Sequence, residues 1–478
     1  MREISREQRL LRMRSDNPWW ADGRIRRDYE HLRERGYCPR FADLVTKRDV
    51  QRAVILMGPR RVGKTVLLHH VIKRLLEAGR HSPREIAYLS LDQPLYTGLS
   101  IEAAAAALGH ASGHENGPRV LFLDEIQYLA DWERHLKAFV DSHPATRCVA
   151  CGSAAAALKR KSTESGAGRF TDFLLPPLTF WEFLRLRNTD DLVELLPGGK
   201  SRSDDIHLLN EQFLDYVNFG GYPEAIASSS VREDPGRYIA ADIVEKVLLR
   251  DLPGLYGIRD VQELNRLFTT LAYNTAEEVS LEGLSRNSGV SKLTLRRYLE
   301  YLEAAFLIKR IHRIDENARR FKRTTHFKVY VTSPSLRTAL FGPVTNDDAA
   351  MGAMVETAVF AQWFHSNARL NYARWSGRHG GEVDIVHLDP RQRPDWCLDV
   401  KWSDRPAARP QELRSLIAFS NRHPTARVLV TSRTKERKHR DWPGTGPLNV
   451  GPAAHYCHAV GRQAIESPAT GATPWFVK

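Results

Sequence analysis

The chain has 478 residues, of which 42% are hydrophobic, and it carries a formal net charge of +13. This length allows two to four domains, and the hydrophobic content is typical of folded globular proteins. No run of eighteen apolar residues is present and the first residues are charged, so we expect a cytoplasmic protein without a membrane span. The positive charge favours nucleic acid as a partner but does not identify one by itself.

A phosphate-binding loop follows a short apolar segment. Residues 58–65 read Gly-Pro-Arg-Arg-Val-Gly-Lys-Thr and fit the pattern G-x-x-x-x-G-K-[ST]. The apolar run 53–57 predicts a strand before this loop, and apolar spacing along 66–76 predicts a helix after it. Backbone N–H groups and the helix N-terminus would bind phosphate, with Lys64 at the β- and γ-phosphates and Thr65 on Mg²⁺. The predicted nucleotide-binding residues are Gly58, Pro59, Arg60, Arg61, Val62, Gly63, Lys64 and Thr65.

A second motif places two acids at the end of an apolar strand. Residues 119–125 read Arg-Val-Leu-Phe-Leu-Asp-Glu. The first acid, Asp124, suits Mg²⁺ coordination through water, and the second, Glu125, suits polarisation of an attacking water. Phosphoryl transfer depends mainly on positioning and charge stabilisation, so these are the groups that it requires.

Strand and helix patterns alternate around the two motifs and predict a parallel sheet with helices on both faces. Ligands bind at the carboxyl ends of the strands in such a sheet. Ser153 falls there and is a candidate contact to the γ-phosphate; it could equally cap the helix that follows, and both roles can hold. Arg169, in a loop of small residues, could stabilise charge on the transferred phosphoryl group, or it is an ordinary surface arginine. The predicted strands are 86–91 and 147–152, and the predicted helices are about 100–109 and 132–141.

These motifs resemble those of prokaryotic AAA+-type P-loop ATPases that carry a C-terminal domain of uncharacterised function. The resemblance covers most of residues 15–402. It implies that Lys64, Thr65, Asp124 and Glu125 act on ATP and Mg²⁺, and that Arg169 is a candidate arginine finger. A finger acting in trans would require a homo-oligomer. Four further segments carry the resemblance: Cys-Gly-Ser at 151–153, where threonine is more common than Cys151, Gly-Arg at 168–169, Leu-Thr-Phe-Trp-Glu-Phe at 178–183 and Gly-Gly-Tyr-Pro-Glu at 220–224.

A winged helix-turn-helix is predicted further along the chain. Residues 280–302 predict two helices separated at Gly289, with Ser291 capping the second, and a strand follows at 305–311. The second helix would present polar side chains to nucleic acid, most simply to DNA. Alternatively, the module only packs inside the ATPase as a structural lid. The predicted nucleic-acid-binding residues are Lys292, Thr294, Arg296 and Arg297.

A second candidate active site lies on two adjacent predicted strands near the C-terminus, which carry Asp384 and the pair Asp399 and Lys401. Residues two apart on a strand share a face, so Asp399 and Lys401 point the same way and Asp384 can oppose them. Glu382 is expected on the other face of its strand and is a second choice.

This arrangement resembles the PD-(D/E)xK motif of nucleases with a restriction-endonuclease-like fold, although Val383 stands where proline is usual. The resemblance implies that Asp384, Asp399 and the helical acid Glu356 bind Mg²⁺, and that Lys401 is catalytic. The alternative is a degenerate nuclease fold that binds nucleic acid or another partner.

The expected fold class is α/β, with a P-loop parallel sheet followed by a winged-helix module and a restriction-endonuclease-like domain. We expect an ATPase coupled to DNA contact and to a metal-dependent nuclease, in genome maintenance or defence. A nucleotide-switched binding scaffold that cuts nothing is the rival hypothesis. The expected segments are a basic helical segment (1–45), the ATPase core (46–187), a helical region (188–275), the winged helix (276–325), the nuclease-like domain (326–440) and a C-terminal tail (441–478).

Overall fold

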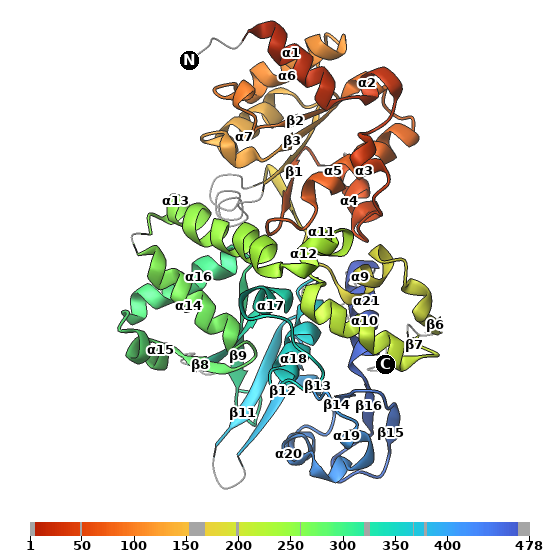
Figure 1. Cartoon of the computed structure of the whole chain (residues 1–478), viewed down its shortest axis with the longest axis vertical. Coiled ribbons are helices and arrows are strands. Elements are labelled where there is room, and N and C mark those ends of the chain that lie inside the picture. Colours follow the sequence, from red (N-terminus) through yellow and green to blue (C-terminus); the bar gives the residue numbers. More distant parts are fainter. Residues whose placement is uncertain are drawn as a thin grey trace. The chain divides into compact units, whose positions relative to one another are not determined.

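The computed structural model describes residues 5–47, 50–152, 168–196, 200–258, 260–319, 326–366, 368–376 and 380–466 (Figure 1). Its contacts divide the chain into two compact units, Met1–Pro176 and Pro177–Lys478. Within the described part of the chain, no helix combines the length and the hydropathy that crossing a bilayer requires.

The first unit contains a five-stranded sheet in which all neighbouring strands run parallel. The strand order is β2-β3-β4-β1-β5, so β4 lies between the strand before the phosphate loop and the strand that ends in Asp124. All five residues of β1, β3 and β4 are buried, as expected of central strands covered on both faces. The strands are β1 (Ala53–Met57), β2 (Ile86–Ser90), β3 (Val120–Asp124), β4 (Arg147–Cys151) and β5 (Phe170–Leu174).

Helices cover both faces of this sheet, as predicted. Met13, Leu108 and Leu136, from α1, α6 and α7, share one core with strand residues of β1 and β3. Figure 1 shows α4 and α5 on the other side. The basic N-terminal segment belongs to this unit, because Trp19 and Met13 are fully buried in it. The helices are α1 (Arg6–Asp16), α2 (Trp19–Asp22), α3 (Arg27–Glu30), α4 (Cys38–Thr46), α5 (Lys64–Glu77), α6 (Ile101–Ser112) and α7 (Trp132–Ser142), with short 3₁₀ turns at Pro83–Glu85, Pro94–Tyr96 and Ile126–Tyr128.

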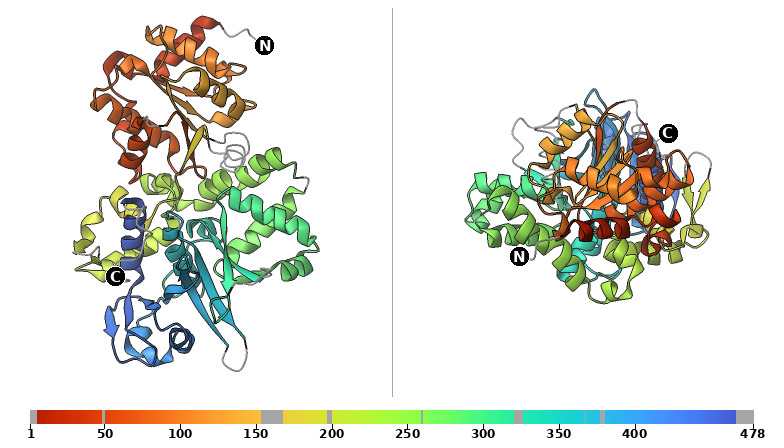
Figure 2. Two further views of the ribbon diagram at one scale, coloured as in Figure 1. Left: turned by 180° about the vertical axis from the view of Figure 1, so that it is seen from behind. Right: turned by 90° about the horizontal axis from the view of Figure 1, so that it is seen from above.

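The second unit is built on a nine-stranded mixed sheet in the order β15-β16-β14-β13-β12-β11-β9-β10-β8. The two antiparallel strands β11 and β12 run side by side through its middle (Figure 2). The predicted winged-helix strands are therefore continuous with the strands of the second candidate site. The strands are β8 (Glu278–Ser280), β9 (Ile308–Ile314), β10 (His326–Val331), β11 (Leu370–Trp375), β12 (Gly381–Leu388), β13 (Pro394–Asp399), β14 (Arg427–Ser432), β15 (Arg437–His439) and β16 (Leu448–Pro452); a separate hairpin pairs β6 (Glu194–Leu196) with β7 (Lys200–Arg202).

One apolar core joins four helices to this sheet. Phe180 of α9 and Phe213 of α10 pack with α18 and α21 in it. The segment that contains α9, placed at the end of the ATPase core by its sequence, thus packs in the second unit. Residues 441–466, expected to be part of a C-terminal tail, belong to the fold of this unit, because β16 joins the sheet and α21 buries Cys457 and Val460 in the core.

The remaining helices surround the sheet, and two of them, η5 and η6, are π-helical. The helices of the second unit are α9 (Phe180–Leu186), α10 (Ile206–Phe219), α11 (Pro223–Ala227), α12 (Ser229–Glu233), η5 (Gly236–Glu245), η6 (Val247–Asp251), α13 (Leu252–Tyr256), α14 (Val261–Tyr273), α15 (Leu281–Ser288), α16 (Lys292–Ala304), α17 (Ser335–Phe341), α18 (Met351–Trp363), α19 (Arg405–Ala408), α20 (Arg414–Arg422) and α21 (Ala453–Glu466), with 3₁₀ turns at Asp190–Leu192 and Pro410–Glu412.

Candidate functional site

The phosphate loop is a tight turn between β1 and α5. A Cβ atom on Gly58 would lie 2.3 Å from the carbonyl oxygen of Leu175, so only glycine fits there. Gly63 and Arg61 have φ angles of 87° and 63°, in the left-handed region that glycine adopts readily and other residues rarely do. Successive N–H groups in such a turn form an anion-binding concavity at the N-terminus of α5.

Lys64 lies inside this loop and is 6% exposed. Its Nζ donates hydrogen bonds to the carbonyl oxygens of Pro59 (2.7 Å) and Gly58 (3.1 Å). Burial lowers the pKa of Lys64, while the nearby Cys151, Glu125 and Asp124 oppose that shift. Neutral carbonyl oxygens thus hold the ammonium at the loop. A bound phosphate would offer charged oxygen acceptors in their place.

Asp124 receives four hydrogen bonds at the carboxyl end of β3. The donors are Cys151 Sγ (2.5 Å), Thr65 Oγ1 (2.7 Å), the Glu125 backbone N–H (2.9 Å) and Tyr88 OH (2.9 Å). Burial raises the pKa of Asp124 despite these donors. Asp124 and Thr65 fit Mg²⁺, which is usually held by one or two protein oxygens together with substrate phosphates and water.

Glu125 lies directly after β3 with a φ of 52°, an uncommon conformation for a residue with a side chain. Strained conformations of this kind concentrate at functional sites. Gln127 donates a hydrogen bond to its Oε2. The turn therefore gives the Glu125 carboxylate a direction different from that of Asp124.

Arg35 is a site residue that the sequence patterns did not indicate. It is 4% exposed, and its guanidinium donates to the carbonyl oxygens of Val62 (2.6 Å) and Pro176 (3.1 Å). It thus fixes the phosphate loop to the segment after β5. No motif marks this arginine, which is one of many in a basic N-terminal stretch.

The structure separates Arg169 from the phosphate loop of its own chain. Arg169 precedes β5, and its carbonyl oxygen accepts from the Ala53 N–H at the start of β1, whereas the loop follows the end of β1. A strand of five residues spans roughly 15 Å. The Arg169 side chain pairs instead with Asp141 at 2.6 Å. Ser153 lies outside the described residues.

The second unit brings the acids of the other candidate site together. Asp399 Oδ2 lies 3.0 Å from Lys401 Nζ, and Asp384 Oδ2 lies 3.7 Å from the same atom. The Val400 N–H donates to Asp384 at 2.8 Å. Glu356 of α18 accepts from Tyr330 OH at 2.6 Å. We refer to Glu356, Glu382, Asp384 and Asp399 as the acid cluster.

A second lysine, Lys328 of β10, occupies the acid cluster and was not predicted. Its Nζ lies 2.7 Å from Glu382, 2.9 Å from Glu356 and 3.4 Å from Asp384. The expectation that Glu382 points away from Asp384 was wrong: residues two apart on a strand share a face, and both reach Lys328. A lysine within the apolar run 327–332 was the available signal for this residue.

The two lysines and the burial shift the pKa values of the cluster in opposite directions. Burial raises the pKa of Asp384, but Lys328 and Lys401 outweigh it, and the net shift is downward. Burial and then the Asp384 charge raise the pKa of Asp399 and of Glu356. The cluster therefore favours a shared proton between its carboxyl groups, as in other close carboxylate pairs.

As it is folded, the acid cluster does not fit a divalent ion. Among the described residues, no group of three or more His, Cys, Asp or Glu side chains is arranged to hold one. The carboxylates are engaged with ammonium groups, and Lys328 lies among three of them. A metal role for Glu356, Asp384 and Asp399 thus requires a rearrangement.

The predicted recognition helix α16 begins after Gly289, whose φ is 74°, and Ser291 Oγ accepts from the Thr294 N–H at 3.1 Å. Lys292, Arg296 and Arg297 are exposed, and Thr294 is half-buried. Lys292 lies 3.9 Å from Glu282, while neither Arg296 nor Arg297 forms an ion pair within the described residues. The helix therefore presents two available guanidinium groups to solvent.

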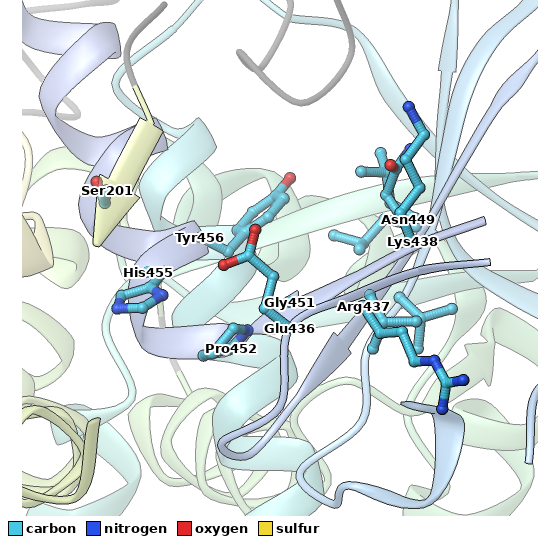
Figure 3. Close-up of a pocket in the computed structure, with 13 residues that line it drawn as sticks. Ser201, Glu436, Arg437, Lys438, Asn449, Gly451, Pro452, His455 and Tyr456 are labelled. Atoms are coloured by element: carbon cyan, nitrogen blue, oxygen red, sulfur yellow. The ribbon is translucent and has the colours of Figure 1, made fainter. Parts of the chain in front are cut away.

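A further cavity, of about 180 Å³, lies between β14, β16 and α21 (Figure 3). Its polar lining includes Lys438, Asn449, His455 and Tyr456. The Tyr456 hydroxyl already accepts a hydrogen bond from Trp363 Nε1 at 3.0 Å. None of the residues singled out from the sequence lines this cavity.

Comparison with known proteins gives two family matches. Residues 50–184 match the model of an AAA domain, and residues 210–347 match a domain of unknown function (DUF8612). The AAA match includes the phosphate loop and Asp124, whereas Asp384, Asp399 and Lys401 lie beyond both matches. With its parallel sheet, this match shows that the first unit has the α/β P-loop NTPase fold.

The chain is also similar to uncharacterized proteins of other organisms and to solved structures. An uncharacterized protein of Haemophilus influenzae is 24% identical over 83% of this chain and 93% of its own length. MJ1544, an uncharacterized protein of Methanocaldococcus jannaschii, is 24% identical over 72% of this chain and 74% of its own length. The Aeropyrum pernix ORC2 protein, solved as ADPNP–ADP complexes, is 14% identical, with a TM-score of 0.40 over 66% of this chain and 95% of that chain. That TM-score is too low to carry an argument about this chain.

Proposed function

We propose that the first unit binds and hydrolyses ATP. The observation that carries this proposal is the network in which Asp124 accepts from Thr65 at 2.7 Å while Lys64 lies buried in the phosphate loop. A cation for the phosphates and an oxygen pair for a metal are thus held at the carboxyl edge of one sheet, where ligands bind in this class of fold.

Each side chain has a distinct task in this proposal. Lys64 would exchange its two carbonyl acceptors for phosphate oxygens and stabilise their charge. Thr65 and Asp124 would hold Mg²⁺, which neutralises phosphate charge when bound. Glu125 would orient and polarise the attacking water, because its turn directs the carboxylate away from the Asp124 network.

Hydrolysis of ATP by Lys64→Ala tests this assignment, with Lys73→Ala on the same helix as the matched control. We expect loss of at least about 100-fold in turnover for Lys64→Ala, because transition-state charge loses its cation. Glu125→Gln should bind ATP and hydrolyse it slowly. Unchanged turnover in Lys64→Ala would remove the phosphate loop from the mechanism.

We further propose that the second unit binds nucleic acid through α16. The support is local: two guanidinium groups and one ammonium group project from one exposed helix. Exposed cations of this kind contact phosphates and set the position of a protein on nucleic acid. In this proposal the ATP state of the first unit regulates that binding.

The acid cluster supports a second candidate function, cleavage of phosphodiester bonds. Asp384, Asp399 and Lys401 converge within 3.7 Å although they come from different strands or strand ends. Lys401 would stabilise the charge that develops on a phosphoryl oxygen, and a carboxylate would take the proton of water. A scaffold that cuts nothing is the alternative.

Incubation of plasmid and single-stranded DNA with the full chain, with and without ATP, in Mg²⁺ or Mn²⁺ buffer, tests cleavage. We expect nicking that Lys401→Ala reduces by about 100-fold or more. Lys309→Ala, an exposed lysine on β9, is the matched control. No cleavage by wild type, alongside intact ATP hydrolysis, would favour the binding scaffold.

A further inference from the structure

Lys328 is placed where a charged side chain is costly. It belongs to β10, in which Phe327, Val329, Tyr330 and Val331 are also buried, and it is 3% exposed. Its neighbours across the sheet, Ile311 on β9 and Glu278 on β8, fix its position. A buried ammonium persists only where carboxylates compensate its lost hydration.

The compensation comes from three carboxylates on two elements. Glu356 belongs to α18, while Glu382 and Asp384 belong to β12, and each places one oxygen within 3.4 Å of Lys328 Nζ. The Lys328 ammonium donates hydrogen bonds to Glu356 and Asp384, and Glu382 forms an ion pair with it at 2.7 Å. The three carboxylates equally need Lys328, because like charges at this spacing repel strongly.

The same three oxygens define the position that a divalent ion would take. Hard cations such as Mg²⁺ and Mn²⁺ bind carboxylate oxygens, and the carboxylates here converge on one point. Lys328 Nζ occupies that point. Lys401 lies near the other oxygen of Asp384 and pairs with Asp399, so it does not compete with Lys328 for the same position.

A cavity adjoins this position. A cavity of about 470 Å³ is lined by Lys328, Glu356, Glu382, Glu278 and Arg374, among others. Its lining is mostly charged, so a hydrated ion can enter it. Displacement of Lys328 into this cavity would keep the ammonium near Glu278.

We propose that Lys328 is the resident cation of the acid cluster, and that a divalent ion binds there only when the Lys328 ammonium moves out. The proposal rests on the proposed phosphodiester site, whose metal occupancy it would control. Wild-type protein is then expected to bind Mn²⁺ weakly at this cluster. A partner or ligand that displaces the Lys328 ammonium would allow the divalent ion to bind.

Titration of free Mn²⁺ by electron paramagnetic resonance, without nucleotide, tests the proposal on the full chain. Lys328→Met should bind one additional Mn²⁺ at least about tenfold more tightly than wild type, because the competing charge is gone. Lys328→Arg keeps the charge and should stay weak. Lys309→Met makes the same substitution at an exposed site of the neighbouring strand and should match wild type.

Thermal unfolding supplies a second measurement. Lys328→Met should melt at a lower temperature than wild type in EDTA, and Mn²⁺ should restore it. Adding Asp384→Asn should abolish that restoration and so locate the ion. Wild type should show no such stabilisation by Mn²⁺, and this arm does not depend on whether Lys328→Met folds.

Two results would overturn the inference: tight Mn²⁺ binding by wild type at the acid cluster, or equal affinities for wild type and Lys328→Met. DNA cleavage by the same variants is a separate measurement, and it distinguishes failure of this inference from failure of the nuclease proposal. If Lys328→Met gains Mn²⁺ and cuts nothing, the inference holds and the nuclease proposal fails. If wild type cuts DNA and already binds Mn²⁺ tightly at the cluster, the nuclease proposal holds and the inference fails.

Discussion

Buried charges at single residues define both candidate sites, and each is balanced by specific partners. Lys64 is held by two carbonyl oxygens, Asp124 by four donors, and Lys328 by three carboxylates. Removing Lys328 alone leaves uncompensated buried carboxylates, which is more destabilising than removing the whole ionic set. Arg35 is also buried with specific partners, since its guanidinium donates hydrogen bonds to the carbonyl oxygens of Val62 and Pro176.

Two buried histidines of α21 predict acid lability. Burial lowers the pKa of His455 to about 4 and that of His458 to about 3, whereas the unfolded chain has a histidine pKa of about 6.5. Between these values the unfolded state binds more protons, so stability is complete above pH 6.5 and is lost as the pH falls. The loss approaches about 1.4 kcal/mol per pH unit for each histidine.

Urea unfolding at pH 7 and pH 5 measures this effect. His455→Leu is the useful variant, since His455 Nε2 has no hydrogen-bond partner within the described structure. Its stability loss between the two pH values should be about 1–2 kcal/mol smaller than that of wild type. The exposed His207→Leu on α10 serves as the control. An equal loss in wild type and His455→Leu would mean that the folded state binds the His455 proton as readily as the unfolded state does.

At the scale of elements, the sheet order of the first unit decides which loops meet. Insertion of β4 between β1 and β3 still leaves the phosphate loop and Asp124 at one edge, because all strands are parallel. In the second unit, β10 supplies Lys328, while α18, β12 and β13 supply the acids. Elements that are far apart in the sequence therefore build one site.

The helix α16 carries a prediction about nucleic-acid binding. Changing Arg296 and Arg297 to glutamine should weaken binding of duplex DNA at 50 mM salt. It should also reduce the slope of log affinity against log salt by about 2, since each lost phosphate contact contributes about 0.9. Arg391→Gln with Arg393→Gln, at an exposed turn between β12 and β13, removes the same charge elsewhere and is the control.

Fluorescence anisotropy over a salt series gives both quantities. A slope that the α16 substitutions leave unchanged would mean that the helix is a packing element, the alternative left open by the sequence. A slope that falls equally in the control would assign binding to overall charge rather than to α16.

The sequence predicted local structure well and spatial neighbours less well. The strand 53–57 agrees with β1, and the helix after the loop begins two residues earlier than predicted, because α5 starts within the phosphate loop at Lys64. The periodicity of apolar residues is sufficient to predict such strands and helices. It does not predict the order of strands in a sheet. The distance of Arg169 from its own phosphate loop and the position of Lys328 within the acid cluster could therefore not be predicted.

At the scale of the whole molecule, the position of Arg169 bears on assembly. Since β5 separates it from the phosphate loop of its own chain, Arg169 can act on a nucleotide only from a neighbouring copy. An arginine finger of this kind contributes about 10³–10⁵ to turnover. We therefore expect Arg169→Ala to be nearly inactive, while Asp141→Ala, which removes only its ion-pair partner, stays active.

Mixing two inactive variants distinguishes action in trans from an ordinary surface role. Lys64→Ala keeps Arg169 but lacks a working phosphate loop, and Arg169→Ala has the reverse defect. In an equal mixture of exchanging subunits, half of the loops are intact and half of their neighbours carry the arginine, so about a quarter of the wild-type rate should return for any closed ring. Native mass spectrometry confirms that mixed oligomers form. Mixed oligomers without ATP hydrolysis would show that Arg169 does not complete a neighbouring site.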